Sequence, residues 1–301
     1  MNTLISNMLA KKEKELIYTD LIKNRKEYSE TWEVDAKHFF ENSYYDWMAE
    51  GVAESKNILE IGCGAGYSTL ALLNNNHKVI SIEENSFCID KTEKLLKSKG
   101  FNVAKINNRE VYKTSPQSRY ILEYKNIAKE LGEYDVILVQ GDIINDPKFI
   151  RWLTEDSAFS IDAVVCWLLG THGSRGSNQV FDLSQVQESS TARIHTQNII
   201  YELCDEILKE NDYLHIVDRV IDVDNVDIVE SVSMNHEGQA STSKMKVLGV
   251  KKMIYEEATK GMSMNIREST KDSKMIDRKG IYNCCDKLFV SVLSQKVINN
   301  L

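Results

Sequence analysis

The sequence predicts an α/β fold built on a doubly wound, mostly parallel sheet. Three features of residues 57–84 support this prediction. An apolar stretch at residues 57–61, NILEI, has the composition of a buried parallel strand. A glycine-rich turn and a helical pattern at residues 67–73 follow it, and a second apolar strand at residues 79–82 ends on Glu83. Strand, turn, helix and strand in this order form the βαβ unit of such sheets.

The turn between the two strands carries glycines at alternate positions, Gly62, Gly64 and Gly66. Glycine permits a positive φ and lets a ligand lie against the backbone. The N–H groups and the positive dipole end of the next helix face the same turn. Glu83 offers a carboxylate that accepts hydrogen bonds from both hydroxyls of a ribose. The unit therefore predicts a nucleoside site at the carboxyl ends of the strands.

The spacing of the glycines indicates which nucleoside is bound. The dinucleotide fingerprint, G-x-G-x-x-G, places its third glycine one position later, where this sequence has Tyr67. Glu60, just before the turn, adds a carboxylate that suits a cationic ligand better than a pyrophosphate. The run LEIGCGAG at residues 59–66 closely resembles the first motif of class I S-adenosylmethionine-dependent methyltransferases. The resemblance covers residues 55–255 and the last strand.

This resemblance implies a seven-stranded sheet, S-adenosyl-L-methionine as cofactor and S-adenosyl-L-homocysteine as product. Ligands of a doubly wound sheet lie beyond the carboxyl ends of its strands. This rule and the resemblance together select a set of cofactor-binding residues. The set is Glu60, Gly62, Cys63, Gly64, Gly66, Glu83, Glu84, Gly141, Asp142, Ile143 and Trp167.

Composition limits the classes of protein to consider. The chain has 301 residues, of which 42% are hydrophobic and 27% charged, as in ordinary globular proteins. The net charge of −8 argues against nucleic acid as a partner. The 6 cysteines form no C-x-x-C pair, so a zinc site is not expected. Neither a membrane span nor a signal-peptide core is visible, and we expect a cytoplasmic protein.

The first 55 residues predict a helical extension ahead of the main domain, which comprises residues 56–301. Helices are expected at residues 11–26 and 36–48. The second is rich in aromatic residues, a pattern typical of a helix packed on the core. In the resembled family a helix at this place often covers the cofactor, which makes Tyr44, Tyr45 and Trp47 candidates for a lid.

The order of the strands after the second is open to two interpretations. In one, residues 102–106 are the third strand, residues 136–139 the fourth and residues 161–169 the fifth. In the other, residues 101–133 form an insertion that contains a helix over residues 117–131. Residues 136–139 are then the third strand and residues 161–169 the fourth. We favour the second interpretation, because Gly141-Asp142 resembles the end of the family's third strand, where an acid lies beside the adenine.

The remaining elements follow the same pattern. A helix begins at Asp146-Pro147, with an N-cap and a proline in its first turn. Later elements are a helix over residues 189–210, a strand over residues 213–220, and two final strands over residues 247–255 and 288–296. In the resembled family the last two form an antiparallel tail. Residues 256–286 are polar and weakly patterned, which predicts a second insertion on the surface.

The segment CWLLGTHGSRG at residues 166–176 supplies the candidates for binding and activating a methyl acceptor. His172 is a candidate general base, because histidine changes its charge near neutral pH. Arg175 is a candidate for holding an acceptor anion. Trp167 is a candidate for stacking on the acceptor, and Tyr44 for contacting it from the lid. A loop histidine bonded to backbone and a tryptophan packed in the core remain alternatives.

The function predicted from these residues is transfer of a methyl group to a small molecule or a protein side chain. An aminopropyltransferase of the same fold is an alternative, although no paired aspartates follow the fourth strand. A non-catalytic module that binds a cofactor or partner is another. The Asn-Pro-Pro-Tyr motif of amino-methylating nucleic-acid enzymes is missing from residues 166–170, which argues against DNA methylation. The acceptor and the oligomeric state are not indicated.

Overall fold

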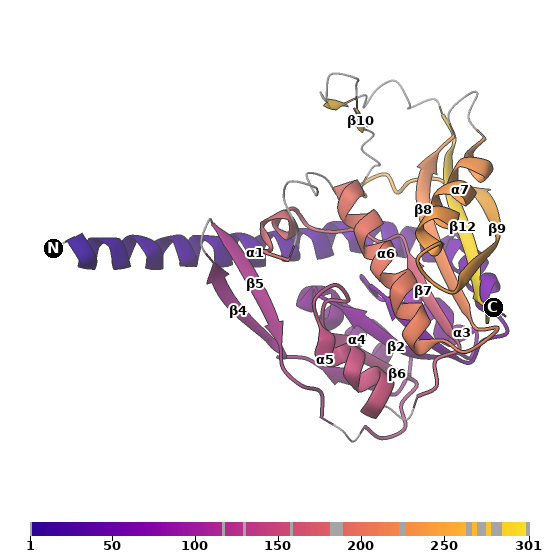
Figure 1. The fold of residues 1–301 in the computed structure, drawn as a ribbon, viewed down its shortest axis with the longest axis horizontal. Coiled ribbons are helices and arrows are strands. Elements are labelled where there is room, and N and C mark those ends of the chain that lie inside the picture. The colour runs from indigo at the N-terminus through magenta and orange to yellow at the C-terminus, as the bar shows by residue number, and fades with distance from the viewer. Residues whose placement is uncertain are drawn as a thin grey trace.

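The structure, a computed structural model, describes residues 2–115, 118–128, 131–156, 159–180, 189–222, 227–262, 267–269, 275–277 and 285–298. An eight-stranded sheet forms its centre (Figure 1). The strands of the sheet are β1 (Asn57–Ile61), β2 (Lys78–Glu83), β3 (Val103–Ile106), β6 (Val136–Gln140), β7 (Ala163–Trp167), β8 (Tyr213–Ile221), β9 (Met245–Ile254) and β12 (Lys287–Lys296). Their order across the sheet is β3-β6-β2-β1-β7-β8-β12-β9.

The directions of the strands confirm the predicted fold class. Strands β3, β6, β2, β1, β7 and β8 pair in parallel, and β12 runs antiparallel between β8 and β9. The prediction of seven strands is wrong, because β3 pairs in parallel with β6 and adds an eighth strand at the edge. With β6 beside β2 and β7 beside β1, these two strands take the places that the favoured interpretation gave them. That interpretation is wrong in assigning residues 103–106 to an insertion, because they form β3 of the central sheet.

The helix predicted over residues 117–131 is absent from the described residues. Strands β4 (Glu110–Ser115) and β5 (Arg119–Tyr124) form an antiparallel hairpin there. Tyr120, Leu122 and Tyr124 are buried at every second position and pack against Leu21. Burial at every second position is the pattern of a strand. Tyr120 and Tyr124 are also four residues apart, so the same tyrosines suggested a helical stripe.

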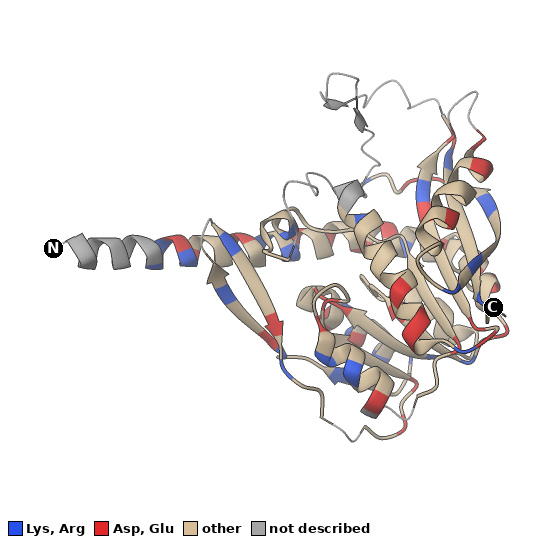
Figure 2. Ribbon diagram, in the orientation of Figure 1, with Lys and Arg blue, Asp and Glu red and all other residues tan. Residues whose placement is uncertain are grey.

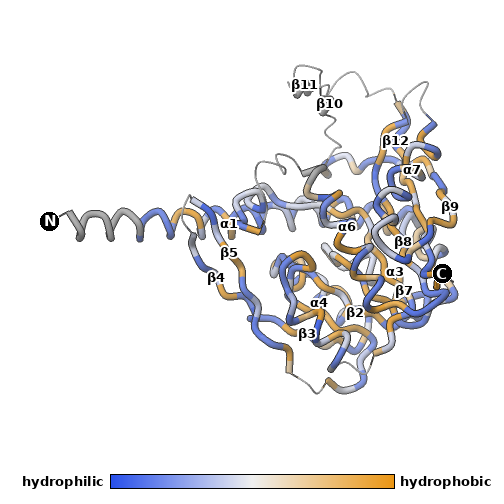
Figure 3. Tube along the Cα trace, in the orientation of Figure 1, coloured by the Kyte–Doolittle hydropathy of each residue, from blue (hydrophilic) through white to orange (hydrophobic). Residues whose placement is uncertain are grey.

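Helices cover both faces of the sheet. One face is covered by α2 (Tyr44–Ala49), α3 (Tyr67–Asn74) and α4 (Ser86–Ser98), and the other by α5 (Pro147–Arg151), α6 (Ser189–Ile207) and α7 (Ile228–Ala240). Consecutive strand residues alternate between the faces: Ile58 belongs to the first core and Leu59 to the second. Figure 3 shows hydrophobic segments gathered along the strands and the helices beside them. Short helical turns lie at Glu50–Val52, Trp152–Asp156 and Gly173–Ser177.

The N-terminal extension is dominated by one helix, α1 (Asn2–Glu41), and not by the two separate helices that were predicted. Residues 27–35 contain neither proline nor glycine, so nothing interrupts the helix there. The chain breaks instead at Ser43, which has a φ of 59° and precedes α2. The first turns of α1 project away from the body of the protein (Figure 1). Its later turns pack against the sheet through buried Trp32, Ala36 and Phe39.

The predicted surface insertion at residues 256–286 lies largely outside the described residues. Within it, β10 (Arg267–Ser269) and β11 (Met275–Asp277) form an antiparallel pair. Acidic and basic residues are interspersed over the described elements (Figure 2). Among the described helices, none has both the length and the hydrophobicity needed to cross a membrane.

Candidate functional site

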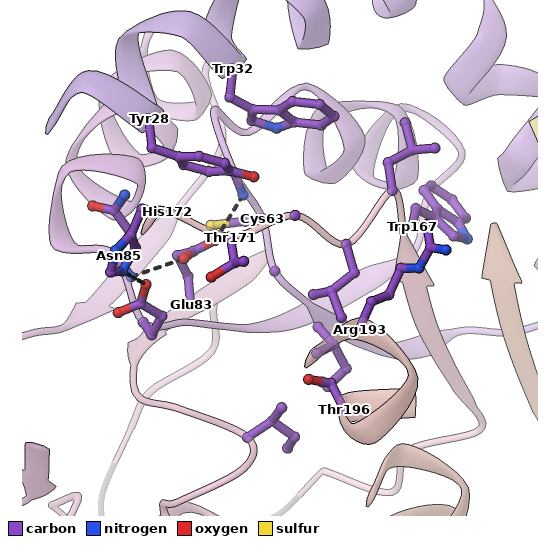
Figure 4. A pocket seen from close by; sticks show the side chains of 18 of the residues that line it. Tyr28, Trp32, Cys63, Glu83, Asn85, Trp167, Thr171, His172, Arg193 and Thr196 are labelled. Atoms are coloured by element: carbon purple, nitrogen blue, oxygen red, sulfur yellow. Dashed lines mark hydrogen bonds and ion pairs between the residues drawn. The ribbon is translucent and has the colours of Figure 1, made fainter. Parts of the chain in front are cut away.

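A cavity of about 380 Å³ lies at the carboxyl ends of β1, β2, β6 and β7. This volume falls within the roughly 300–1,000 Å³ that small-molecule sites occupy. The strands contribute Ile61, Ile82, Glu83 and Trp167, and the loops after them contribute further lining residues. Figure 4 shows that Tyr28 and Trp32 of α1 cover the cavity from the other side. The predicted place of the site, at this edge of the sheet, therefore does hold a cavity.

The glycine turn forms one wall of the cavity. Gly62, Gly64 and Gly66 all have positive φ values, of 86°, 50° and 87°. A Cβ atom on Gly64 would lie 2.4 Å from Trp32 Nε1, so the indole rests directly against the turn. Gly62 and Gly64 line the cavity, whereas Gly66 is the N-cap residue of α3. The first two glycines thus form part of the cavity wall, and Trp32 covers the turn at Gly64.

Gly66 is expected to be required for packing. A Cβ atom there would lie 2.9 Å from the Cα atom of Thr92, and the positive φ adds strain. We expect Gly66→Ala to lower the free energy of unfolding by about 1–3 kcal/mol. Gly238→Ala on α7 is the control, because nothing lies within 4 Å of its Cβ position, and it should be neutral or stabilising. Urea unfolding of both variants tests this, and equal changes would contradict it.

Glu60 lies beneath the turn and not in the cavity wall. Its two carboxylate oxygens accept hydrogen bonds of 2.6 Å from the hydroxyls of Ser68 and Thr69 in the first turn of α3. Burial raises the pKa of Glu60, and the two hydroxyl groups oppose that shift. In the structure these hydrogen bonds to the carboxylate link α3 to β1. The predicted contact of Glu60 with a cofactor is therefore not a direct one here.

Glu83, at the end of β2, faces the glycine turn across the cavity. Its Oε2 accepts from the N–H of Gly64 at 3.1 Å, and its Oε1 accepts from the N–H of Asn85 at 2.9 Å. Burial and the neighbouring Glu84 raise the pKa of Glu83 to about 7, although both N–H groups favour the ionised form. The carboxylate lines the cavity, as predicted, next to Gly62 and Gly64.

Glu84 has the opposite electrostatic environment. Its Oε2 accepts from Arg25 Nη2 at 2.6 Å, and its Oε1 lies 2.7 Å from His172 Nε2. Burial favours the neutral acid, but Arg25, His172 and Arg175 outweigh it and hold the pKa of Glu84 well below its usual range. Since an ionised carboxylate only accepts, the Nε2 atom of His172 carries the proton. These ion pairs join α1, the end of β2 and the loop after β7.

Asp142 follows β6 in the loop that begins at Gly141, and Ile143 lies beside it in the cavity wall. Its Oδ1 accepts from Arg175 Nη2 at 2.7 Å and from the N–H of Ile144 at 3.1 Å. The predicted adenine acid is thus buried, lines the cavity and is paired with a cation. The acid motif that fixed the strand order lies where the sequence placed it.

The loop after β7 bends back toward the end of the cavity that Glu83, Glu84 and Asp142 line. Leu168 has a φ of 56°, and Gly173–Ser177 then forms a short helical turn. This brings His172 to Glu84 and Arg175 to both Glu84 and Asp142. The two residues proposed for the acceptor therefore lie against carboxylates of β2 and β6. Their roles as general base and anion holder remain predictions.

Trp167 lies at the end of β7 and forms part of the cavity wall. Its Nε1 donates to Nδ1 of His215 at 3.0 Å, and Nε2 of His215 lies 2.6 Å from the hydroxyl of Ser291. Burial lowers the pKa of His215 to about 3, so this histidine stays neutral and can accept a hydrogen bond from the indole N–H. Tyr45 stacks on Trp167 with its ring centroid at 6.5 Å. The indole is held in place by these contacts, and its N–H group is used in the hydrogen bond to His215.

The structure separates the three aromatic residues proposed for the lid. Tyr45 lines the cavity, but Tyr44 does not, because it packs on Phe289 and its hydroxyl accepts from the N–H of Glu256. Trp47 packs on the core of the same face. The residues that actually cover the turn are Tyr28 and Trp32. Their spacing of four residues was the signal available in the sequence.

Sequence reasoning also missed the residues at the opposite end of the cavity from Asp142. They come from α6, from the middle of β8 and from the predicted second insertion. These residues are Ala192, Arg193, Thr196, Asp218, Arg219 and Met262. No motif marks them, since they meet only when α6 and β8 pack beside β7.

Comparisons with known proteins find only remote likenesses to solved structures. No protein-family model and no curated protein matches the chain. Among solved structures, the chain is similar to the N-methyltransferase NodS of Bradyrhizobium japonicum in complex with S-adenosyl-L-homocysteine, with 10% identity, coverage of 85% of this chain and 87% of that one, and a TM-score of 0.41.

Two further solved structures resemble the chain to a similar degree. One is a SAM-dependent methyltransferase of Methanosarcina mazei, with 13% identity, coverage of 82% and 94%, and a TM-score of 0.39. The other is a putative RNA methyltransferase of Pyrococcus horikoshii, with 12% identity, coverage of 86% and 83%, and a TM-score of 0.40. Likenesses this remote assign no activity to the chain.

Proposed function

We propose that this protein is an S-adenosylmethionine-dependent methyltransferase that acts on a small-molecule or protein acceptor. The observation that carries the proposal is the position of Glu83, whose carboxylate lies at the end of β2 and lines one cavity together with Gly62 and Gly64 of the glycine turn. A carboxylate at that point suits the two hydroxyls of a ribose. An open glycine turn suits a ligand that lies against the backbone.

The lining residues fit such a cofactor. Gly62 and Gly64 would hold its amino-acid part, Glu83 its ribose, and Asp142 with Ile143 its adenine. When bound, the cofactor supplies a sulfonium methyl group that is already electrophilic. The protein's task is then mainly to align the acceptor and to exclude water. Tyr28 and Trp32 of α1 cover the turn and suit the second task.

The alternatives receive less support from the cavity. An aminopropyltransferase needs carboxylates to hold a polyamine beyond the fourth strand. The loop after β7 instead presents His172 and Arg175, and the far end of the cavity contains Arg193 and Arg219. A non-catalytic module that binds a partner has no need to keep Glu83 beside the glycine turn in one cavity.

Binding of S-adenosyl-L-homocysteine at pH 8 tests the cofactor assignment. We expect micromolar-range binding by calorimetry, weakened about 10–100-fold in Glu83→Gln because a charge-assisted hydrogen bond to the ribose is lost. Glu123→Gln is the matched control, because Glu123 is an exposed residue of β5, and this variant should bind normally. If neither this ligand nor S-adenosyl-L-methionine produces heat with the wild type, the proposal fails. Transfer of labelled methyl to an acceptor panel, compared with His172→Ala, then tests for a general base.

A further inference from the structure

The cavity has two chemically different ends. The order β6-β2-β1-β7-β8 across the sheet places Asp142 and Glu83 on one side and Trp167 and Asp218 on the other. Figure 4 shows this separation, with Glu83 and His172 on one side of the cavity and Trp167, Arg193 and Thr196 on the other. If the first end holds a nucleoside, as the proposed function requires, the second end is left for the acceptor.

The charged side chains at the second end differ in how fully they are hydrogen-bonded. Arg219 is fixed, since its Nη1 donates to the carbonyl of Met262 at 3.0 Å and its guanidinium lies 5.6 Å over the ring of Trp32. Asp218 is also engaged, because its Oδ2 accepts from Gln197 Nε2 at 2.7 Å. Arg193 is different: its nearest carboxylate oxygen, Asp218 Oδ1, lies 3.7 Å from Nη1, which is too long for a hydrogen bond.

The guanidinium of Arg193 therefore has N–H groups for which no described residue provides a hydrogen-bond acceptor. Among the described residues no hydrogen bond to its guanidinium is formed, and its Nε is buried without a partner. Its side chain is 34% exposed, so the guanidinium is reachable. A guanidinium presents several N–H groups in a rigid fork that matches a carboxylate. An oxyanion that enters this end of the cavity would complete the set of hydrogen bonds.

Two tryptophans form the apolar part of the wall at this end, beside the polar residues Thr196, Asp218 and Arg219. Trp167 lines the cavity with Tyr45 stacked on it, and Trp32 closes the α1 side. Aromatic rings bind planar groups by offset stacking. The structure thus combines a planar apolar surface with an unsatisfied guanidinium within one compartment.

From this combination, and on the basis of the proposed function, we infer that the acceptor is a planar, aromatic carboxylic acid whose carboxylate binds Arg193. A cationic acceptor would meet Arg193 and Arg219, and Asp218 is the single carboxylate among the described residues that line that end. Like charges at this distance disfavour such a ligand. A neutral acceptor would leave the donors of Arg193 unused.

The inference is tested with the full chain saturated with S-adenosyl-L-homocysteine. The probes are 4-hydroxybenzoate and indole-3-carboxylate, each compared with its neutral amide and with the corresponding amine by calorimetry. We expect the acids to bind at least about tenfold more tightly than the amides. Arg193→Gln should abolish this preference, and Arg193→Lys should retain part of it. Arg151→Gln on α5, whose side chain is exposed, is the control and should keep the wild-type preference.

Three outcomes would overturn the inference. They are equal binding of acids and amides by the wild type, retention of the preference in Arg193→Gln, and tightest binding of the amines. Binding of S-adenosyl-L-homocysteine without binding of any acid at about 10 mM also rejects the inference, while the proposed function stands. Failure to bind S-adenosyl-L-homocysteine itself rejects the proposed function.

Discussion

Replacing Arg25 with methionine is expected to lower the free energy of unfolding by about 3–5 kcal/mol, the usual cost of removing one partner of a buried ion pair. Arg25 is 1% exposed and binds two carboxylates, Glu84 through Nη2 at 2.6 Å and Glu110 through Nη1 at 2.8 Å. Its removal leaves both acids partly buried without their shared cation. Glu84 retains His172, but Glu110 retains only the weak contact with Gln140 at 3.4 Å.

The loss should depend on pH. The pKa of Glu84 lies well below its usual range, so ionised Glu84 stabilises the fold above the pKa it has in the unfolded chain, and this stabilisation disappears as the pH falls. Burial raises the pKa of Glu110, so that acid accepts a proton readily once Arg25 is gone. The difference in stability between wild type and Arg25→Met should therefore be larger at pH 7 than at pH 4.

Urea unfolding at the two pH values measures this difference. Lys26→Met is the matched control, because Lys26 is the next residue of α1 and its ion pair with Glu30, at 3.9 Å, is exposed. That substitution should change stability by less than about 1 kcal/mol. The double variant Arg25→Met/Glu110→Gln should recover part of the loss, because it removes the carboxylate that keeps only the contact with Gln140. Similar effects of Arg25→Met and Lys26→Met would show that the buried pairs do not hold α1 in place.

The parts of the fold that the sequence predicted are those that local pattern determines. The strand, turn, helix and strand of residues 57–83 share one continuous signal, and Glu83 is found at its expected strand end. Gly141-Asp142 identified β6 as the neighbour of β2 for the same reason. The hairpin of β4 and β5 was not predicted, because the spacing of its tyrosines fits both the period of a strand and the period of a helix. Contact with Leu21, about 100 residues away, decides between them.

The residues of the candidate site also fall into those that a local sequence pattern predicts and those that it does not. Residues at strand ends were predictable, since parallel strands bring their carboxyl ends to one edge. Trp32 and Arg193 were not, because their places depend on how α1 and α6 pack over that edge. His172 was recognised as unusual, but its position was not predictable: the left-handed φ of Leu168 turns the loop toward Glu84 and away from the acceptor end. No pattern in the sequence specifies that turn.

The affinity for S-adenosyl-L-homocysteine is expected to rise with pH up to about 7 and then to level off. Glu83 is the cause: burial and the charge of Glu84 raise its pKa to about 7, and only the ionised carboxylate accepts from both ribose hydroxyls. Below pH 7 binding must displace a proton, so affinity should fall up to about tenfold per pH unit. Between pH 8 and pH 5 the total loss should be about 10–100-fold.

Calorimetry in two buffers with different ionisation enthalpies gives the number of protons released. At pH 6 a group with a pKa of about 7 is mostly protonated, so close to one proton should leave when the ligand binds. The control is Glu83→Gln, which should bind weakly with a nearly flat pH profile. Any slope that remains in that variant belongs to other groups. An unchanged slope in Glu83→Gln would contradict the role given to Glu83.

The same carboxylate links binding to stability. Because the pKa of Glu83 is raised in the folded protein, the free protein should lose stability as the pH rises from about 4.5 toward about 7. Glu83→Gln should remove this loss, so the variant should match or exceed the stability of the wild type at pH 8 while binding the ligand poorly. A variant that is both less stable and unable to bind would instead make Glu83 a structural support for the turn at Gly64. Urea unfolding without ligand, combined with the binding data, separates these two roles.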